Sequence, residues 1–357
     1  MRHGIQLEHT ELLQDDRAGY ATVIQKINDI IKCLKEEEKS SWCDPDFGPT
    51  EEDEYGAFSI YWEGKAPKPV GNNIYPRPDH VRWERPTWDR PTHDKDEDGD
   101  VNEGDPEDDY EDDYGDEFDL SSGSADKWCT KGKLFKDGVC SDDVKQGSLG
   151  DCWFLSSLAT LATQPDKLRQ CFCLEKDPNK SSWQLFGKKG FWEKCRECGI
   201  IVCRFMKNFE WYYVLIDDRI PVNDRSGEPV FAHDKANGDE LWVPLIEKAY
   251  AKLHGSYDSL IGGYIDRGLS DLTGMVSEQI TLRPNHQGFL ASTKRKLDND
   301  PRRSKGNYDT LVKEAAFKDC FFKDMLSRFQ SGSLMGCSIQ PDRGAKSGAK
   351  VEQKVGL

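Results

Sequence analysis

The stretch QGSLGDCWFLSSLATLA, residues 146–162, decides how the globular part of this chain folds. From Gly150 to Thr163 the residues are small or apolar at a spacing that suits one helix, and Pro165 lies where such a helix would stop. The glycines at 147 and 150 predict a flexible turn just before it. We therefore expect a buried helix that opens near Cys152.

This placement gives Cys152 a chemical interpretation. A catalytic thiol must be partly ionised, and the N-terminus of a helix stabilises a thiolate. Gln146, six residues upstream, could donate its side-chain N–H to the oxyanion that forms when a thiolate attacks a peptide carbonyl. The alternative is that Cys152 is only a buried cysteine in an apolar helix.

Further elements follow from hydrophobic spacing on both sides of this stretch. An amphipathic helix is predicted at 20–34, a strand or hairpin at 209–222 and a long helix at 240–256 that Gly255 ends. Gly262 and Gly263 form a hinge candidate, followed by a helix at 310–332 and a short strand candidate at 333–339. From Trp42 to Pro91 the many prolines and glycines predict irregular chain, anchored by Trp83 and Trp88.

Composition limits the classes of function. The 357 residues are 36% hydrophobic and 32% charged, with a net charge of -16, so a nucleic-acid partner is not expected and cations such as calcium are favoured. No apolar run approaches the roughly 20 residues of a membrane span. The opening residues lack the apolar stretch of a secretory signal, which favours a cytoplasmic protein whose 12 cysteines stay reduced.

An acidic run fills residues 94–119, and it predicts a disordered insertion or linker. Within it, 94–105 follows the oxygen-ligand spacing of an EF-hand loop, but Asp105 replaces the bidentate Glu and nearby prolines leave no room for flanking helices. A calcium loop and a plain acidic linker both stay open. Cys195 and Cys198, with Cys203 close by, have metal-ligand spacing, but one such pair is weak evidence for zinc, so we interpret them as structural.

Several segments resemble the calpain family in the family's own order: KLFKDGVCSDDVKQGSLGDCWFL at 133–155, GEPVFAHDKANGDELWVPLIEKAYAKLHGSYDSLIGG at 227–263, SDLTG at 270–274 and FQSGSLMGCSI at 329–339. DPDFGP and VRWERP resemble the region that precedes the protease core. The resemblance implies an α+β, papain-like protease core of two subdomains. It divides the chain into a pre-domain at 1–92, the acidic insertion at 93–121, a first subdomain at 122–262 and a partial second subdomain at 263–357.

On this resemblance Cys152 is the nucleophile, Gln146 the oxyanion donor and Gly262 a backbone contact to substrate. The family also binds Ca²⁺ in its first subdomain. The positions that match here are the carboxylates of Asp143 and Glu228 and the backbone carbonyls of Lys136 and Gly138. The alternative for Asp143 and Glu228 is that they are ordinary loop acids in solvent.

The resemblance implies a calcium-dependent cysteine endopeptidase that makes limited cuts in protein substrates. The family's catalytic histidine and orienting asparagine lie in GHAYS-type and NPWG-type segments, and the sequence to Leu357 contains neither. Of the seven histidines only His286 merits a test as a substitute.

We therefore expect this chain alone to be inactive. The alternative is a non-catalytic calpain-like protein that binds calcium or partners. Membrane or regulatory partners would act through C-terminal domains outside this chain, and the sequence predicts no oligomeric state.

Overall fold

The computed structural model describes residues 5–6, 17–66, 75–89, 129, 132–136, 138–177, 183–235, 239–279 and 320–337. The acidic run and its 94–105 loop lie outside these residues, so both predictions made for them stay open. The structure combines helices with antiparallel strand pairs, which confirms the α+β prediction. The predicted divisions of the chain stay predictions.

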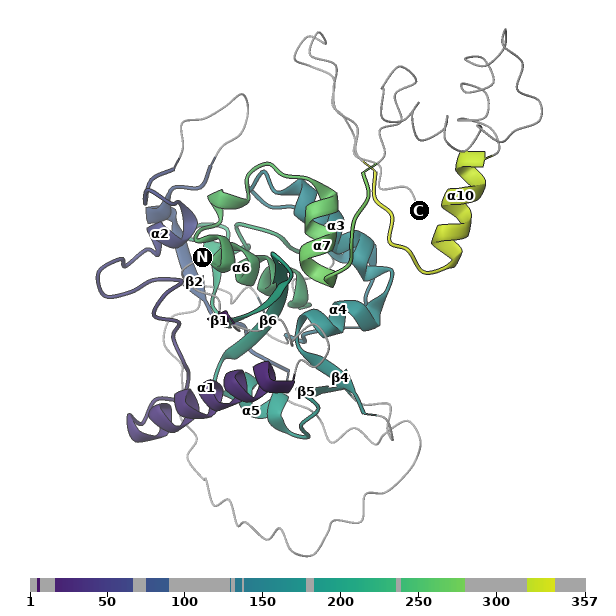
Figure 1. Ribbon diagram of the computed structural model, residues 1–357. Coiled ribbons are helices and arrows are strands. Elements are labelled where there is room, and N and C mark those ends of the chain that lie inside the picture. The colour runs from purple at the N-terminus through teal and green to yellow at the C-terminus, as the bar shows by residue number, and fades with distance from the viewer. Residues whose placement is uncertain are drawn as a thin grey trace, which may run out of the picture.

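Helix α6 (Trp242–His254) lies near the middle of the molecule (Figure 1). The predicted helix at 240–256 is confirmed, and Gly255, at φ 102°, ends it in the left-handed conformation that glycine adopts without strain. Every residue of α6 before His254 is buried, including Glu247, Lys248 and Lys252. A helix that is buried all round must satisfy its charged groups inside the protein.

The main sheet packs against α6. Strands β6 (Ile200–Lys207) and β7 (Glu210–Asp217) form an antiparallel hairpin, and β1 (Ile5–Gln6) pairs with the other edge of β7. The turn falls at Asn208 and Phe209, both at positive φ. The strand predicted at 209–222 is therefore two strands, because β8 (Ile220–Asn223) leaves this sheet.

Strand β8 pairs with β2 (Val81–Glu84), which lies in the stretch predicted to be irregular. That prediction was wrong here and at α2 (Ala57–Ile60) and the 3₁₀ turn η2 (Pro78–His80). The two tryptophans named as anchors do bond to the body of the protein. Trp83 Nε1 donates to the Tyr55 carbonyl at 2.9 Å, and Trp88 Nε1 donates to Asp218 Oδ2 at 2.9 Å.

Helix α1 (Arg17–Glu36) confirms the amphipathic helix predicted at 20–34. Its apolar side chains Val23, Ile27 and Ile31 are buried in the core. At its N-terminal end the Tyr20 ring packs edge-on against Phe186, with 4.7 Å between ring centroids. The helix thus packs its apolar face onto the core at the edge of the fold.

The elements around the predicted site are short. The 3₁₀ turn η3 (Ser141–Asp143) leads into β3 (Val144–Lys145), which pairs with β9 (His233–Asp234). Helix α3 (Cys152–Ala162) is followed by α4 (Pro165–Cys171), and β4 (Leu174–Lys176) pairs with β5 (Trp183–Leu185) before α5 (Phe191–Glu197).

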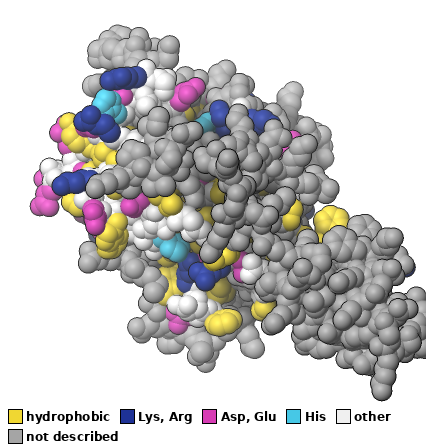
Figure 2. Space-filling model, turned by 90° about the horizontal axis from the view of Figure 1, so that it is seen from above, with side chains coloured by type: hydrophobic (Ala, Val, Ile, Leu, Met, Phe, Trp, Pro, Cys, Tyr) yellow, Lys and Arg dark blue, Asp and Glu magenta, His cyan; other side chains and the backbone are white. Residues whose placement is uncertain are grey.

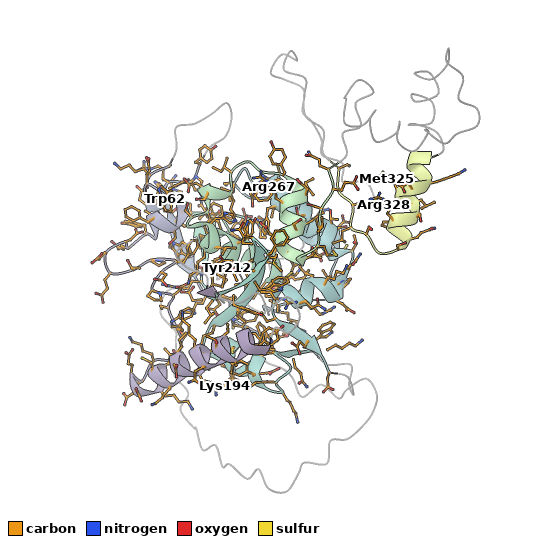
Figure 3. All side chains as sticks on the ribbon, in the orientation of Figure 1. Trp62, Lys194, Tyr212, Arg267, Met325 and Arg328 are labelled. Atoms are coloured by element: carbon orange, nitrogen blue, oxygen red, sulfur yellow. The ribbon has the colours of Figure 1, made fainter. Side chains whose placement is uncertain are left out.

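After α6 the chain forms the 3₁₀ turn η4 (Asp258–Leu260) and α7 (Ile265–Thr273), which packs on α3. Helix α10 (Cys320–Gln330) lies at the periphery (Figure 1), and its Arg328, labelled in Figure 3, forms an ion pair with Glu278 at 2.8 Å. It confirms the described part of the helix predicted at 310–332. Residues 333–337 form no strand, so the strand candidate is not found in its described part.

Charged and hydrophobic side chains are interspersed on the described surface seen in Figure 2. Within the part of the chain that the structure describes, no helix combines the length and apolarity that crossing a bilayer requires.

Candidate active site

Cys152 is the first residue of α3, as the sequence predicts. The Asp151 carbonyl accepts hydrogen bonds from the N–H groups of Phe154 (2.8 Å) and Leu155 (3.2 Å), and these bonds start the helix. Phe154, Leu155 and Leu158 are buried and hold α3 against the core. The Cys152 side chain is half-buried, so the packing of the helix fixes the thiol while part of it stays accessible.

The turn before Cys152 is held by the segment 230–231. Ser148 N–H donates to the Val230 carbonyl at 2.9 Å. A Cβ atom on Gly147 would lie only 2.3 Å from the Phe231 carbonyl oxygen, so the two backbones touch and only glycine fits.

Gln146 stands at the start of this turn and is exposed. Its Nε2 donates to the Leu149 carbonyl at 2.6 Å, which ties the side chain to its own turn. A side-chain amide has two N–H groups, so a second one is available to an oxyanion. Its role as oxyanion donor stays a prediction.

Gly262 is joined directly to the same turn. Its N–H donates to the Gly150 carbonyl at 3.1 Å, and its φ of 75° lies in the left-handed region. The Trp153 indole donates to the Leu260 carbonyl at 2.8 Å, and a Cβ on Gly263 would lie 2.3 Å from the Trp153 ring. Since the Gly262 N–H is already used, any backbone bond from this residue to a peptide would come from its carbonyl.

An acidic cluster lies at the start of α6. Carboxylate oxygens of Asp143, Asp234 and Glu240 all lie within 4.8 Å of one another. The pairing of Val144 with Asp234 in β3 and β9 brings the first two together. Lys136 N–H donates to Glu240 Oε1 at 3.1 Å and adds Glu240 to the cluster.

Burial and like charge act together on this cluster. Burial raises the pKa of Glu240 to about 7, opposed by the Lys136 N–H and reinforced by the charges of Asp143 and Asp234. Burial also raises the pKa of Asp143, and Asp234 and Asp142 add to the effect. Carboxylates held this close are stabilised by a hard cation, so the donor set fits Ca²⁺.

The cluster differs in part from the predicted calcium ligands, which stay predictions. Glu228 does not belong to the cluster, and its backbone carbonyl accepts from Asn223 N–H at 2.8 Å in the turn after β8. Asp143 keeps its predicted place, Lys136 lies beside the cluster, and Gly138 belongs to the same loop at φ 101°. Asp234 and Glu240 could not be predicted from the sequence, because only the β3–β9 pairing and the approach of the 133–136 loop to α6 bring them together.

The described histidines have other surroundings. His233 Nδ1 lies 2.8 Å from the Phe231 carbonyl, and His80 lies beside Asp79 and Asp224. His254 is mostly buried, and burial, with Lys207, lowers its pKa to about 4. His286 lies outside the described residues, so its prediction stays untested.

Cys195 and Cys203 are buried, and Cys198 is half-buried. Burial raises the pKa of the Cys195 thiol to about 12, and Cys198 adds to the shift. Within the described ranges these cysteines form no metal-binding group. Their interpretation as structural residues therefore stays the simpler one.

Comparison with known proteins identifies one family. A model of the calpain family cysteine protease matches residues 124–356. Over 247 residues, 66% of this chain, the sequence is 32% identical to calpain-8 of Mus musculus, of which 28% is covered. The calpain-2 catalytic subunit of Gallus gallus is 31% identical over 64% of the chain and 25% of its own length.

A calpain-type cysteine protease, ADL1 of Oryza sativa subsp. japonica, is 41% identical over 44% of the chain and 6% of its own length. The chain thus covers at most 28% of the length of these curated relatives.

Proposed function

This chain belongs to the calpain family of cysteine proteases, and from that premise we propose that it carries the nucleophile-bearing part of a calcium-dependent cysteine endopeptidase that makes limited cuts in proteins. The observation that supports this most is the position of Cys152, at the first residue of α3 on a turn bonded to Gly262.

In this proposal the Cys152 thiolate attacks the carbonyl carbon of a peptide bond, and a C–S bond forms as the carbonyl π electrons move to oxygen. The second N–H of Gln146 stabilises that oxyanion. The Gly262 carbonyl accepts a bond from the substrate backbone. Exposed Ile261 and Tyr264, on either side of the glycine pair, offer apolar surface to an extended peptide.

The reaction also needs a histidine that takes the thiol proton and returns a proton to the leaving amine. Among the described histidines, His80 lies beside two aspartates, His233 faces a backbone carbonyl, and His254 is mostly buried with a lowered pKa. No GHAYS-type segment occurs in the 357 residues. We therefore propose that this chain alone is inactive. Cytoplasmic location and the absence of a nucleic-acid partner stay predictions.

Calcium would be held by the acidic cluster. Asp143, Asp234 and Glu240 would supply carboxylate oxygens, and the loop at 136–138 would supply carbonyls. A bound Ca²⁺ would supply the positive charge that these carboxylates lack, and would link the loop before Cys152 to the start of α6. The same cluster supports the second candidate, a calpain-like protein that binds calcium or partners without catalysis.

The deciding experiment measures cleavage of an unfolded protein substrate by the full 357-residue chain, with and without millimolar calcium, against a Cys152→Ser variant. We expect no turnover. Turnover that requires both calcium and Cys152 would show that a histidine of this chain, His286 first of all, completes the catalytic pair, and would overturn the proposed inactivity. Turnover that persists in Cys152→Ser would show that Cys152 is not the nucleophile.

A further inference from the structure

Two carboxyl groups lie buried directly behind the nucleophile. Asp151, the residue before Cys152, is 0% exposed, and Glu247 on α6 is 1% exposed. Asp151 is also the N-cap of α3, yet its side chain makes no capping hydrogen bond. Neither residue has a role in the proposed reaction, so their burial needs another explanation.

The two carboxyl groups lie within hydrogen-bonding reach of each other. Apart from this mutual contact, no hydrogen-bond donor of another residue reaches Oδ1 or Oδ2 of Asp151, or Oε1 of Glu247. The other oxygen of Glu247, Oε2, accepts the Ala232 N–H at 2.9 Å. A hydrogen bond between the carboxyl groups requires that one of them be protonated, because a carboxylate has no hydrogen to donate.

The charged groups nearby have other partners and do not neutralise the charge of the pair. Lys248, the next residue on α6, is bound to Asp217 of β7 at 2.5 Å. From β9, Asp234 belongs to the acidic cluster together with Asp143 of η3, and the His233 ring faces the Phe231 carbonyl. After α6, the buried phenol of Tyr257 lies close enough for both carboxyl charges to raise its pKa, in addition to burial.

Two ionised carboxylates in contact inside a protein repel each other and lose their hydration, so one proton is retained. Burial raises the pKa of Asp151 to about 6, and burial, followed by the Asp151 charge, raises that of Glu247 well above its ordinary value. The positive end of α3 favours the negative charge on Asp151, which leaves the proton on Glu247.

We propose that Asp151 and Glu247 share one proton, and that this acid pair is a positioning device for Cys152. The Glu247 carboxyl holds Asp151 through the proton and Ala232 through its other oxygen. In the same segment, 230–232, the Val230 carbonyl accepts a hydrogen bond from Ser148 N–H, and the Phe231 backbone lies directly against Gly147. The turn that carries Cys152 is therefore held at both ends, at Gly147 and Ser148 through the 230–232 segment and at Asp151 directly, and both sets of contacts lead to Glu247.

The shared proton predicts how stability depends on pH. Unfolded carboxyl groups lose their protons near pH 4, whereas the folded pair keeps one proton above that pH. Above that pH the folded state binds one more proton than the unfolded state, so the stability that this pair contributes is fully present at low pH and is lost as pH rises through the folded pKa. For one proton the folding equilibrium constant falls about tenfold per pH unit in that window.

Glu247→Gln tests this proposal, because an amide donates to the Asp151 carboxylate without a titrating proton. In the full chain we expect the thermal midpoint of wild type to decrease as the pH rises from about 5 to about 8. The decrease should be smaller in Glu247→Gln. Glu193→Gln, which removes an exposed carboxylate on α5, is the matched control and should follow wild type. Equal pH slopes in all three proteins would overturn the shared proton.

A second measurement reports positioning. The rate at which iodoacetamide alkylates Cys152, followed by mass spectrometry of its peptide, should change several-fold in Glu247→Ala and return toward wild type in Glu247→Gln. Alkylation of exposed Cys140 should stay constant. An unchanged Cys152 rate in Glu247→Ala would refute the positioning role. If the variants fail to fold, the infrared carbonyl band of a protonated carboxylic acid at pH 7 is measured in Glu240→Gln, because Glu240, with a pKa of about 7, would add its own band in wild type. A band in Glu240→Gln supports the shared proton, and its absence refutes the proposal.

Only the role of the positioned thiol as a nucleophile rests on the proposed function. The pH dependence of stability and the infrared band need no peptidase activity, so a failed cleavage assay leaves this inference standing. Loss of the pH effect would equally leave the family assignment and Cys152 in place.

Discussion

At the scale of single residues, the contact between Gly147 and the 230–231 backbone controls the turn that carries Cys152. In Gly147→Ala the new Cβ would lie 2.3 Å from the Phe231 carbonyl oxygen and 2.5 Å from that of Val230. Since neither backbone atom can rotate away, we expect a loss of about 3 kcal/mol in the free energy of unfolding, measured by urea denaturation.

Gly150→Ala is the control from the same turn. Its Cβ would meet only Ile261 Cγ2, at an ordinary 3.4 Å, so we expect a change within about 1 kcal/mol. Equal losses in the two variants would mean that the turn moves freely past the 230–231 segment, and the rigid presentation of Cys152 would then be wrong.

The residues of the site differ in how far the sequence could predict them. Cys152 was placed correctly because a local apolar pattern and its glycines define where α3 begins. Glu228 stays a predicted partner of Asp143, whereas Asp234 and Glu240 could not be predicted, since strand pairing and a loop contact bring them beside Asp143. The Asp151–Glu247 contact joins positions 96 apart and has no local signal in the sequence.

At the scale of elements, helices were predicted better than strand pairs. The helices α1, α3 and α6 follow from the spacing of their own apolar residues. Strand β2 was missed because its four residues lie among prolines, and its partner β8 lies well over 100 residues away. A strand is stabilised mainly by its packing against the neighbouring strand, so the sequence of a short strand alone gives little indication that it forms.

The β3–β9 pair and the 133–136 loop make a prediction about calcium at this scale. Calcium should raise the thermal midpoint of the full chain, because a ligand that binds only the folded state stabilises it. Glu240→Gln and Asp143→Asn should each abolish most of that rise, whereas Glu228→Gln should retain it.

Differential scanning calorimetry with calcium and with chelator measures these shifts. Magnesium serves as the control ion, since it demands a tighter octahedral site than this cluster of loop oxygens offers. A calcium effect that is lost in Glu228→Gln and kept in Glu240→Gln would restore the ligand set that the sequence suggested.

At the scale of the whole molecule, buried ion pairs attach the N-terminal region to the protease core. Lys252 Nζ on α6 lies 2.6 Å from Asp44 Oδ2, and Asp44 N–H donates to Asp217 Oδ2 at 2.8 Å. Burial alone would raise the pKa of Asp217, but Lys248 and Arg219 outweigh it and lower that pKa. Figure 3 shows Trp62, from the same N-terminal region, at the edge of the body.

Asp44→Ala should therefore destabilise the whole molecule rather than one loop. It would leave the Lys252 ammonium, 4% exposed, without its carboxylate, and removal of one partner of a buried pair costs about 3–5 kcal/mol. Asp46→Ala, two residues away and exposed, should cost under about 0.5 kcal/mol. Adding Lys252→Met to Asp44→Ala removes the unpaired charge and should recover part of the loss. Urea denaturation of the four proteins measures the coupling, and an Asp44→Ala loss no larger than that of Asp46→Ala would mean that the N-terminal region and the core are stable independently of each other.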